Sequence, residues 1–396
     1  MNKQMKTKLN LADKNIAIVT HRSILPCIPG DDLKRFLLNC GVNKLIYITH
    51  PLLLLKESYE LRSKYEYHHT SKLMKTASAY QWILPEFLSY IKDFLYSIYW
   101  VLKSGQTFDI YFGMNNLNAF AGLVLKKLGR VKKVVYYTID LYPQRFSSKI
   151  INWIYHKLDN ICVKFCDETW NVSPFIAQWR ARRGMIGNNY SRQFTVPIGI
   201  WFDDMKRVPL NKVNQKKIVY VGHLKNFYGV DLIIRALPLI RKKIPGIRLE
   251  IIGGGEQMEE LKELANELSA SLNVKFYGWK DKKQAEQLMS DGAIGLAPFN
   301  ILIIDEKIKN ADPAKIKDYL ALGLPVVMTN ATLNANSIAK AKCGAVVDYT
   351  PESLANAVIK LLSNENLRQE YRKNALEYVS QFDWNKLFSK NVSRLV

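Results

Sequence analysis

Short apolar runs alternate with helix-like segments along both halves of the chain. In the first half, the runs that predict buried strands lie at 15–20, 44–49, 109–113, 133–139 and 168–173. The alternation restarts in the second half, where the runs lie at 217–222, 248–252, 274–277 and 292–298. Strands that alternate with helices form parallel sheets. The pattern therefore predicts an α/β protein with two successive doubly wound, Rossmann-like domains.

Changes in this pattern set the predicted domain boundaries. Residues 1–13 are polar and basic and lack an apolar core, so we interpret them as a flexible tail rather than a secretory signal. Residues 204–216 are polar and basic and contain Pro209, which suits a linker between domains. We therefore predict an N-terminal domain over 14–203 and a C-terminal domain over 217–381.

The segment 80–103 has an unusual composition. Apolar and aromatic residues dominate it, although Glu86, Lys92 and Asp93 interrupt them. One interpretation is a helix that packs against the sheet, and the other is a helix that docks at an anionic membrane interface. The chain has no uninterrupted run of about 18 apolar residues, so we expect no transmembrane span.

Charge and cysteine content narrow the classes of partner. The formal net charge is +22, and residues 1–200 carry +15 of it. Basic surfaces attract nucleic acid, anionic lipid or phosphorylated substrates. We find no zinc finger, RNP-type strand or helix-turn-helix signature, so we expect no nucleic acid partner. Five scattered cysteines without a signal peptide indicate reduced thiols and a cytoplasmic protein.

The richest candidate chemistry lies in the stretch 312–327, which reads as loop, helix, stop and buried strand. Asp312 suits the N-cap and Pro313 the first helical position. Lys315 and Asp318 are three residues apart and so project from one face of the helix. A lysine near a helix N-terminus suits a diphosphate, and a carboxylate suits the hydroxyls of a ribose. The alternative is an amphipathic surface helix with incidental charges.

Two further candidates lie in the first half. Asp140 directly follows the predicted strand 133–139 and so stands at the edge of a parallel sheet where ligands bind. A carboxylate there can act as a general base if an acceptor hydroxyl reaches it, and its alternative roles are to cap a loop or pair with Arg145. Gly30 lies in the loop after the first strand, where backbone can approach a phosphate closely. The chain has no Asp-x-Asp metal motif and no P-loop, so we expect no metal.

Four motifs follow one another in the second half over about residues 217–380. They are Val219–Leu224 with Tyr228–Ile233, then Leu249–Gly255, Val274–Gly278 and Asp312–Val327. In order and spacing they resemble the nucleotide-binding domain of GT-B glycosyltransferases, and they are most similar to glycosyltransferase family 4, the group 1 transferases. The resemblance implies two domains that face each other across a cleft, and transfer of a sugar from a nucleoside-diphosphate sugar to an acceptor hydroxyl.

The resemblance also implies roles for particular residues. The implied donor-binding residues are Gly222, His223, Lys225, Gly278, Lys315 and Asp318, and weaker candidates for the donor sugar or diphosphate are Gly30, Asn310 and Asp312. Asp140 is the implied catalytic residue. Asn310 stands where the family often has the first of two glutamates, which leaves the contact to the donor sugar open. Family 4 implies retention of configuration, whereas some related enzymes use an Asp at this place as the base for inversion, so both outcomes stay open.

The resemblance implies no cofactor and no metal beyond the donor substrate. The basic, aromatic first half fits a glycan or lipid-linked sugar acceptor at the cytoplasmic face of a membrane, in cell-surface glycan or glycolipid assembly. The last segment, 382–396, resembles a C-terminal helix that crosses back to the first domain. Two alternatives share the architecture: a nucleotide-sugar 2-epimerase, and a non-catalytic protein that binds sugar nucleotides.

Overall fold

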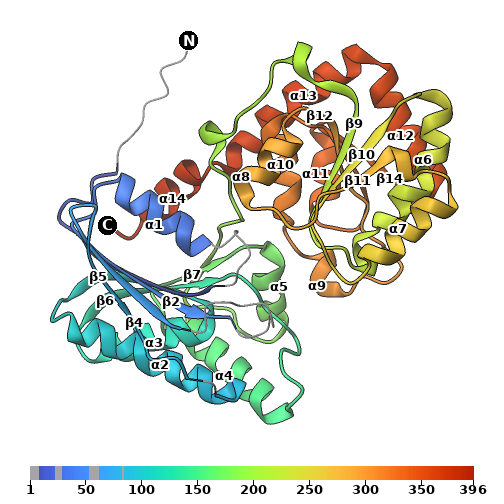
Figure 1. Ribbon diagram of the computed structural model, residues 1–396. Helices are drawn as coiled ribbons and strands as arrows, with labels where there is room; N and C mark the ends of the chain where they lie inside the picture. Colours follow the sequence, from blue (N-terminus) through green and yellow to red (C-terminus); the bar gives the residue numbers. More distant parts are fainter. Residues whose placement is uncertain (1–8, 23–28, 53–61, 83) are drawn as a thin grey trace. The chain divides into compact units, whose positions relative to one another are not determined.

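The computed structural model of the protein describes residues 9–22, 29–52, 62–82 and 84–396 (Figure 1). The chain divides into two compact units. The first unit runs to Pro197 and takes back the C-terminal residues from Trp384, and the second unit comprises Ile198–Asp383. Each unit is built around its own mainly parallel sheet, which agrees with the fold class predicted from the sequence.

The first unit contains an eight-stranded sheet with the order β4-β3-β2-β1-β5-β6-β7-β8. Its strands are β1 Asn15–Arg22, β2 Lys44–Pro51, β3 Lys64–His69, β4 Lys72–Ser78, β5 Phe108–Met114, β6 Val131–Thr138, β7 Glu168–Asn171 and β8 Arg192–Thr195. Strand β3 is antiparallel to both β2 and β4 and forms a hairpin with β4 at one edge, whereas all other neighbours are parallel. The sequence pattern did not predict this hairpin. Its turn places Thr70 and Ser71 at positive φ without the glycine or asparagine that usually signals such a turn.

Helices cover both faces of the first sheet (Figure 1). They are α1 Pro29–Asn39, α2 Glu86–Lys103, α3 Asn115–Lys127, α4 Lys149–Phe165, α5 Pro174–Arg182 and α14 Trp384–Val392. Helices α2, α3 and α4 lie on one face, and α1 and α14 lie on the other. The Phe36 ring of α1 packs 5.5 Å from the Phe388 ring of α14. The final segment therefore belongs to the first unit.

The second unit contains a six-stranded parallel sheet with the order β11-β10-β9-β12-β13-β14. Its strands are β9 Asn214–Val221, β10 Arg248–Ile252, β11 Val274–Phe276, β12 Gly292–Ala297, β13 Val326–Thr329 and β14 Gly344–Val347. Its helices are α6 Val230–Lys243, α7 Met258–Glu267, α8 Lys282–Met289, α9 Glu306–Lys309, α10 Ala314–Leu322, α11 Asn334–Lys340, α12 Pro351–Ser363 and α13 Glu365–Val379. Alternate strand residues face two separate cores, as a doubly wound sheet requires.

Two predicted boundaries differ from the structure. The predicted linker 204–216 lies inside the second unit, because Met205 is buried there and Arg207 donates to the carbonyls of Phe202 and Ala321, each at 2.7 Å. In the predicted tail, residues 1–8 lie outside the described residues, but Leu11 is fully buried. Local polarity predicted exposure in both places, and non-local packing overrides it.

Helix α2 packs against the sheet, as one interpretation of the segment 80–103 predicted, but it does so mainly through polar side chains. Most of its buried positions are polar, namely Ser89, Asp93 and Ser97. Its apolar residues include many exposed ones, which are Phe87, Leu88, Ile91, Leu95, Tyr99 and Leu102. The carboxylate of Asp93 is held by Ser63 at 3.0 Å and Lys92 at 3.2 Å, and two histidines lie beside it at 3.4 Å. Polar contacts thus fix α2 to the sheet, and its apolar side faces outward. No helix in the described part of the chain is long and apolar enough to cross a membrane.

Candidate active site

Lys315 lies in the first turn of α10, at the carboxyl edge of the second sheet. Its amine donates to the Tyr220 hydroxyl at 3.1 Å. The same amine lies 4.3 Å from the ring centre of Tyr220, 4.5 Å from that of Tyr228 and 5.4 Å from that of Phe299. Burial lowers the pKa of Lys315 to about 7. Within the described residues no carboxylate pairs with this amine, so the site holds a cation that an anionic ligand can pair with.

Glycine loops bring backbone close to this amine. A β-carbon at Gly222, just after β9, would lie 2.8 Å from the Lys315 amine, and its φ of +138° suits glycine. One at Gly253, just after β10, would lie 1.9 Å from the Gly222 carbonyl oxygen. The amide of Gly253 donates to the Gly278 carbonyl at 2.9 Å. The three loops that follow these neighbouring strands therefore contact one another in succession, and the Gly222 loop lies against the Lys315 amine.

Aromatic rings surround the same loops. The His223 ring lies 4.6 Å from the Trp279 ring, edge to face, and 6.4 Å from the Tyr228 ring. The Tyr220 hydroxyl donates to the His223 carbonyl at 2.7 Å. Lys225 directly precedes the short helix η3, Asn226–Tyr228. His223 and Lys225 could be identified from the sequence, but the aromatic rings that enclose the Lys315 amine could not, because these rings come from separate strands and loops.

Asp318 lies in a different environment from Lys315. Burial raises its pKa, while the nearby charges of Lys282 and Lys317 act in the opposite direction. Glu286, on α8, is half-buried; this burial raises the pKa of its carboxyl, and the charge of Asp318 adds to the rise. The two functional groups predicted to act side by side thus face different neighbours.

Asp312 is not the N-cap of α10, and that prediction is wrong. Pro313 occupies the N-cap position, and no side chain caps the helix. Asp312 instead accepts hydrogen bonds from the Ile198 amide and the Asn334 side chain, each at 3.1 Å, and pairs with Lys317. Both of its oxygens are therefore engaged within the protein, and the residue anchors α10 to the start of the second unit.

Asn310 ends the short helix α9. Its side-chain amide donates to the Glu306 carbonyl at 2.6 Å and lies 3.4 Å from the Glu306 carboxylate. The Glu306 carboxylate therefore lies beside the position where the family often has a glutamate. Sequence reasoning could have found it only through the one-turn spacing between Glu306 and Asn310.

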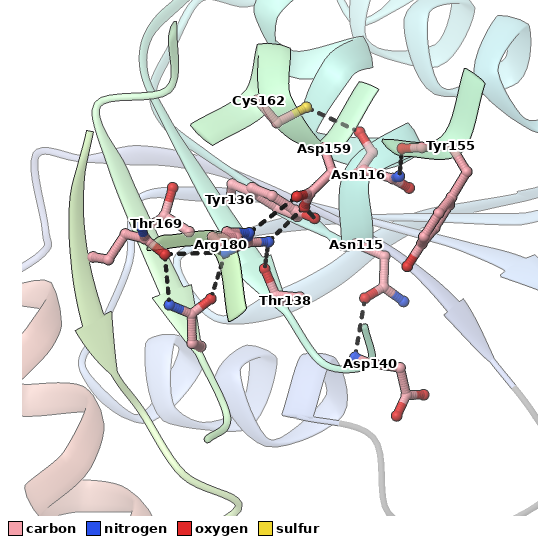
Figure 2. Close-up of polar contacts among 12 residues, drawn as sticks. Asn115, Asn116, Tyr136, Thr138, Asp140, Tyr155, Asp159, Cys162, Thr169 and Arg180 are labelled. Atoms are coloured by element: carbon pink, nitrogen blue, oxygen red, sulfur yellow. Dashed lines mark hydrogen bonds and ion pairs between the residues drawn. The ribbon is translucent and has the colours of Figure 1, made fainter. Parts of the chain in front are cut away.

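Asp140 lies at the carboxyl edge of the first sheet. It is exposed, and Figure 2 shows its carboxylate directed away from the buried polar side chains nearby. The side-chain oxygen of Asn115 accepts from the amides of Ile139 at 3.1 Å and Asp140 at 3.4 Å. Within the described residues no ion pair joins Asp140 to Arg145. Gly30 is buried in the first turn of α1, where a β-carbon would lie 3.1 Å from the Thr20 side chain.

A buried ion pair fixes the strand that carries Asp140. The Arg180 guanidinium donates to the Asp159 carboxylate at 2.5 and 3.0 Å and to the Thr138 hydroxyl at 2.9 Å. Asp159 also accepts from the Tyr136 hydroxyl at 2.6 Å. Figure 2 shows these side chains converging on Arg180. The sequence analysis did not identify this cluster, which ties α4 and α5 to the strand that positions Asp140.

Two units that are each built around a doubly wound sheet have the architecture of the GT-B fold. Residues 202–378 match the family model of glycosyl transferases group 1. This match covers nearly the whole of the second unit, and the protein is a glycosyltransferase.

Relatives of known sequence agree with this assignment. An uncharacterised glycosyltransferase of Methanocaldococcus jannaschii is 25% identical over 70% of this chain and 73% of its own length. A GDP-mannose-dependent α-(1-6)-phosphatidylinositol monomannoside mannosyltransferase of Mycobacterium tuberculosis is 27% identical over 44% of this chain and 45% of its own length. The second match is thus confined to less than half of either protein.

Solved structures show the same fold over nearly the whole chain. The sucrose-phosphate synthase of Thermosynechococcus elongatus superposes with a TM-score of 0.69 at 14% identity, over 96% of this chain and 98% of that one. HepE of Anabaena in complex with UDP-glucose superposes with a TM-score of 0.65 at 16% identity, over 96% and 99%. These likenesses establish the fold of both units.

Proposed function

We propose that the second unit binds a nucleoside-diphosphate sugar at Lys315 and that the first unit presents the acceptor hydroxyl at Asp140. The observation that carries the donor site is the buried, aromatic-enclosed amine of Lys315, which has no carboxylate partner within the described residues. A buried cation is costly unless it is paired. A diphosphate supplies the missing negative charge.

The same site supports departure of the leaving group. Breaking the bond between the sugar and the diphosphate develops negative charge on the nucleoside diphosphate, which positive groups stabilise. The Lys315 amine and the N-terminus of α10 supply that charge. We therefore propose transfer without a metal ion, and addition of EDTA tests this directly. Loss of turnover that Mg²⁺ or Mn²⁺ restores would contradict a metal-independent mechanism.

We assign to Asp140 a contact with the acceptor hydroxyl. As the hydroxyl oxygen bonds to the sugar, its proton must leave, and an exposed carboxylate at the sheet edge can accept a hydrogen bond from it. The Asp140→Asn variant should lower turnover by about 10²-fold or more and leave donor binding unchanged. The anomeric configuration of the product, read by NMR, decides between inversion, with Asp140 as base, and retention, with Asp140 orienting the hydroxyl.

Donor binding provides the test of this function. A ligand that binds the native state raises its melting temperature, so a thermal-shift series with UDP and GDP reports affinity. Both bases are needed because one relative is named for GDP-mannose and HepE is bound to UDP-glucose. Lys315→Met should weaken binding of the preferred nucleotide at least tenfold. The control is Lys340→Met, at the exposed end of α11. Equal affinity in the two variants would exclude Lys315 from the donor site.

We also propose that the enzyme works at the cytoplasmic face of a membrane, in cell-surface glycan or glycolipid assembly. Support comes from the exposed apolar side of α2, from exposed Ile150 and Trp153 on α4, and from the basic first half. Such surfaces bind anionic lipid through apolar burial and charge together. The protein should float with phosphatidylglycerol vesicles at low salt and be released at high salt. Absence from the floating fraction at low salt would contradict this location.

A further inference from the structure

The first unit contains an apolar cavity of about 350 Å³ between α2 and α4. Its lining is mostly aromatic and aliphatic, and the residues that matter below are Phe87, Ile91, Phe94, Ile151, Ile154 and Tyr155. Small-molecule sites typically have volumes of about 300–1,000 Å³ and combine apolar walls with a few polar groups. The proposed donor site at Lys315 lies in the second unit, so this cavity is not part of that site.

Besides its tyrosines, the cavity is lined by four polar side chains, namely His21, Asn115, Asn116 and Arg145. The guanidinium of Arg145 lies 5.3 to 5.7 Å from the ring centres of Tyr142, Phe146 and Tyr155. Among the described residues no carboxylate forms an ion pair with Arg145. The wall of an apolar cavity thus presents a cation that lacks an anionic partner.

The polar side of the cavity adjoins Asp140. Asn115 lines the cavity, and its side-chain oxygen holds the backbone amides of Ile139 and Asp140. Figure 2 shows the Asn115 side chain between the Tyr155 ring and Asp140. A molecule with its apolar part in the cavity would therefore place its polar head beside the residue that we assign to the acceptor.

His21 does not compete with such a head group. Its Nδ1 atom faces the Asn118 amide at 3.0 Å, and its Nε2 atom lies 3.4 Å from the Asp93 carboxylate. Because the Asn118 amide nitrogen can only donate, Nδ1 accepts this hydrogen bond. Both ring nitrogens thus face protein groups, and His21 forms a fixed wall of the cavity.

We propose that this cavity binds the apolar chain of an amphiphilic acceptor whose anionic head pairs with Arg145. The proposal rests on the function proposed above and adds the chemical class of the acceptor to it. The exposed apolar side of α2 supports this proposal, because Phe87 and Ile91 both line the cavity and are about half exposed, at 51% and 47%. Solvent-exposed apolar side chains at the mouth of an apolar cavity are suited to receive a hydrocarbon chain.

The test uses the full chain and a series of alkyl phosphates below their micelle concentrations, with binding measured by calorimetry. Each methylene that enters an apolar site contributes about fourfold in affinity, so hexyl, octyl and decyl phosphate should bind progressively tighter. Inorganic phosphate should bind at least 100-fold more weakly than decyl phosphate. Arg145→Gln should abolish the preference for octyl phosphate over 1-octanol. Equal affinity across the chain lengths would overturn the proposal.

Two matched variants separate the cavity from the surface of α2. Ile91 lines the cavity, whereas Leu95 lies one turn further along the same helix, is 57% exposed and does not line it. Ile91→Asp should weaken decyl phosphate binding at least tenfold, and Leu95→Asp should leave it unchanged. Equal weakening in both would show binding to the helix surface and overturn the proposal. Ile151→Trp, which fills the cavity, provides a second variant that should also lose binding.

Transfer assays distinguish the two proposals. The UDP or GDP thermal shift should be the same in Ile91→Asp as in the wild-type protein, since the donor site lies in the other unit. Chain-length-dependent binding without transfer to any acceptor would support the cavity and overturn the proposed function. Transfer by Ile91→Asp at the wild-type rate to short-chain and long-chain acceptors would overturn the cavity and leave the proposed function standing.

Discussion

Each unit of this protein buries a cation, and the two cations have opposite surroundings. In the first unit, Arg180 donates to Asp159, Thr138 and other side-chain oxygens. In the second unit, Lys315 contacts aromatic rings and the Tyr220 hydroxyl, and burial lowers its pKa to about 7. One cation has its counter-charge built into the fold, and the other has none within the described residues.

The difference indicates what each cation is for. A buried charge that is fully paired and hydrogen-bonded holds elements together. Removal of either partner leaves the other as an uncompensated buried charge, which lowers the free energy of unfolding. A buried charge without a partner lowers stability and persists where a ligand completes it. The Arg180 cluster therefore stabilises the structure around Asp140, and the surroundings of Lys315 fit the donor-binding role that we propose for it.

Removal of Arg180 should give the largest effect. Arg180→Ala leaves the Asp159 carboxylate buried and uncompensated, which should cost about 3–5 kcal/mol of the free energy of unfolding of the first unit. Urea denaturation measures this cost. Arg182→Ala, on the exposed side of the same helix, is the control and should change stability by less than about 0.5 kcal/mol. Similar losses of stability in the two variants would contradict a stabilising role for the buried Arg180–Asp159 pair.

Helix α10 carries both a paired lysine and, within the described residues, an unpaired one, so the two kinds of cation can be compared within one helix. Lys317 pairs with Asp312 and donates to the Ile198 carbonyl, whereas Lys315 has no such partner among the described residues. Lys317→Met should therefore cost about 2–3 kcal/mol of unfolding free energy. Lys315→Met should leave stability unchanged or raise it slightly, because it removes a buried amine and keeps its volume. Thermal unfolding without nucleotide measures both, and a larger loss in Lys315→Met would contradict the assignment.

The protonation of Lys315 should make donor binding depend on pH. With a pKa of about 7, the amine is charged below pH 7 and increasingly neutral above it. The affinity for a nucleoside diphosphate should therefore be level below pH 7 and fall by up to about tenfold per pH unit above it. Titrations from pH 6 to pH 9 measure this fall. Lys315→Met should bind the nucleotide weakly at every pH in this range. A wild-type affinity that does not change between pH 6 and pH 9 would contradict a lowered pKa of Lys315 at the donor site.

The same shift affects stability with a definite sign. The folded-state pKa of about 7 lies below the ordinary lysine pKa of 10.5, so between these values the unfolded chain holds a proton that the folded chain lacks. The contribution of Lys315 to stability therefore rises with pH over this window and is lost as pH falls toward 7. Comparison of the pH profiles of the wild-type protein and Lys315→Met isolates this contribution.

The sequence predicted the parts of this comparison that are local. Strand periodicity located β9 and β12, and glycines at strand ends located the loops beside Lys315. The helix that carries Lys315 was predicted with its stop at Gly323, which is indeed its left-handed C-cap. These features depend on residues within one or two turns of each other, which a linear pattern can show.

The parts that were not predicted depend on contacts between distant segments. Asp312 was predicted to cap α10, but it contacts Lys317 and the Ile198 amide and so anchors the helix to the start of the second unit. The polar face of α2 is buried because Ser63 and His50, from another part of the chain, meet Asp93 there. No local pattern shows which polar residue will find a partner, and that is what separates structural charges from functional ones.

The smallest expected effect concerns a paired cation that is only partly buried. Arg394, beyond α14, bonds to the Glu168 carboxylate at 3.2 Å and lies 3.6 Å from the Phe194 ring centre, with its side chain 28% exposed. Because solvent screens the pair, Arg394→Ala should cost only about 0.5–1 kcal/mol, and Glu168 keeps its bond from the Trp170 indole at 2.8 Å. Lys390→Ala, exposed on α14, is the control. A double-mutant cycle with Glu168→Gln isolates the pair energy. A coupling energy as large as the loss of unfolding free energy in Arg180→Ala would show that pairing, and not burial, determines how much a cation stabilises the fold. The contrast between Arg180 and Lys315 would then depend on what each of them binds.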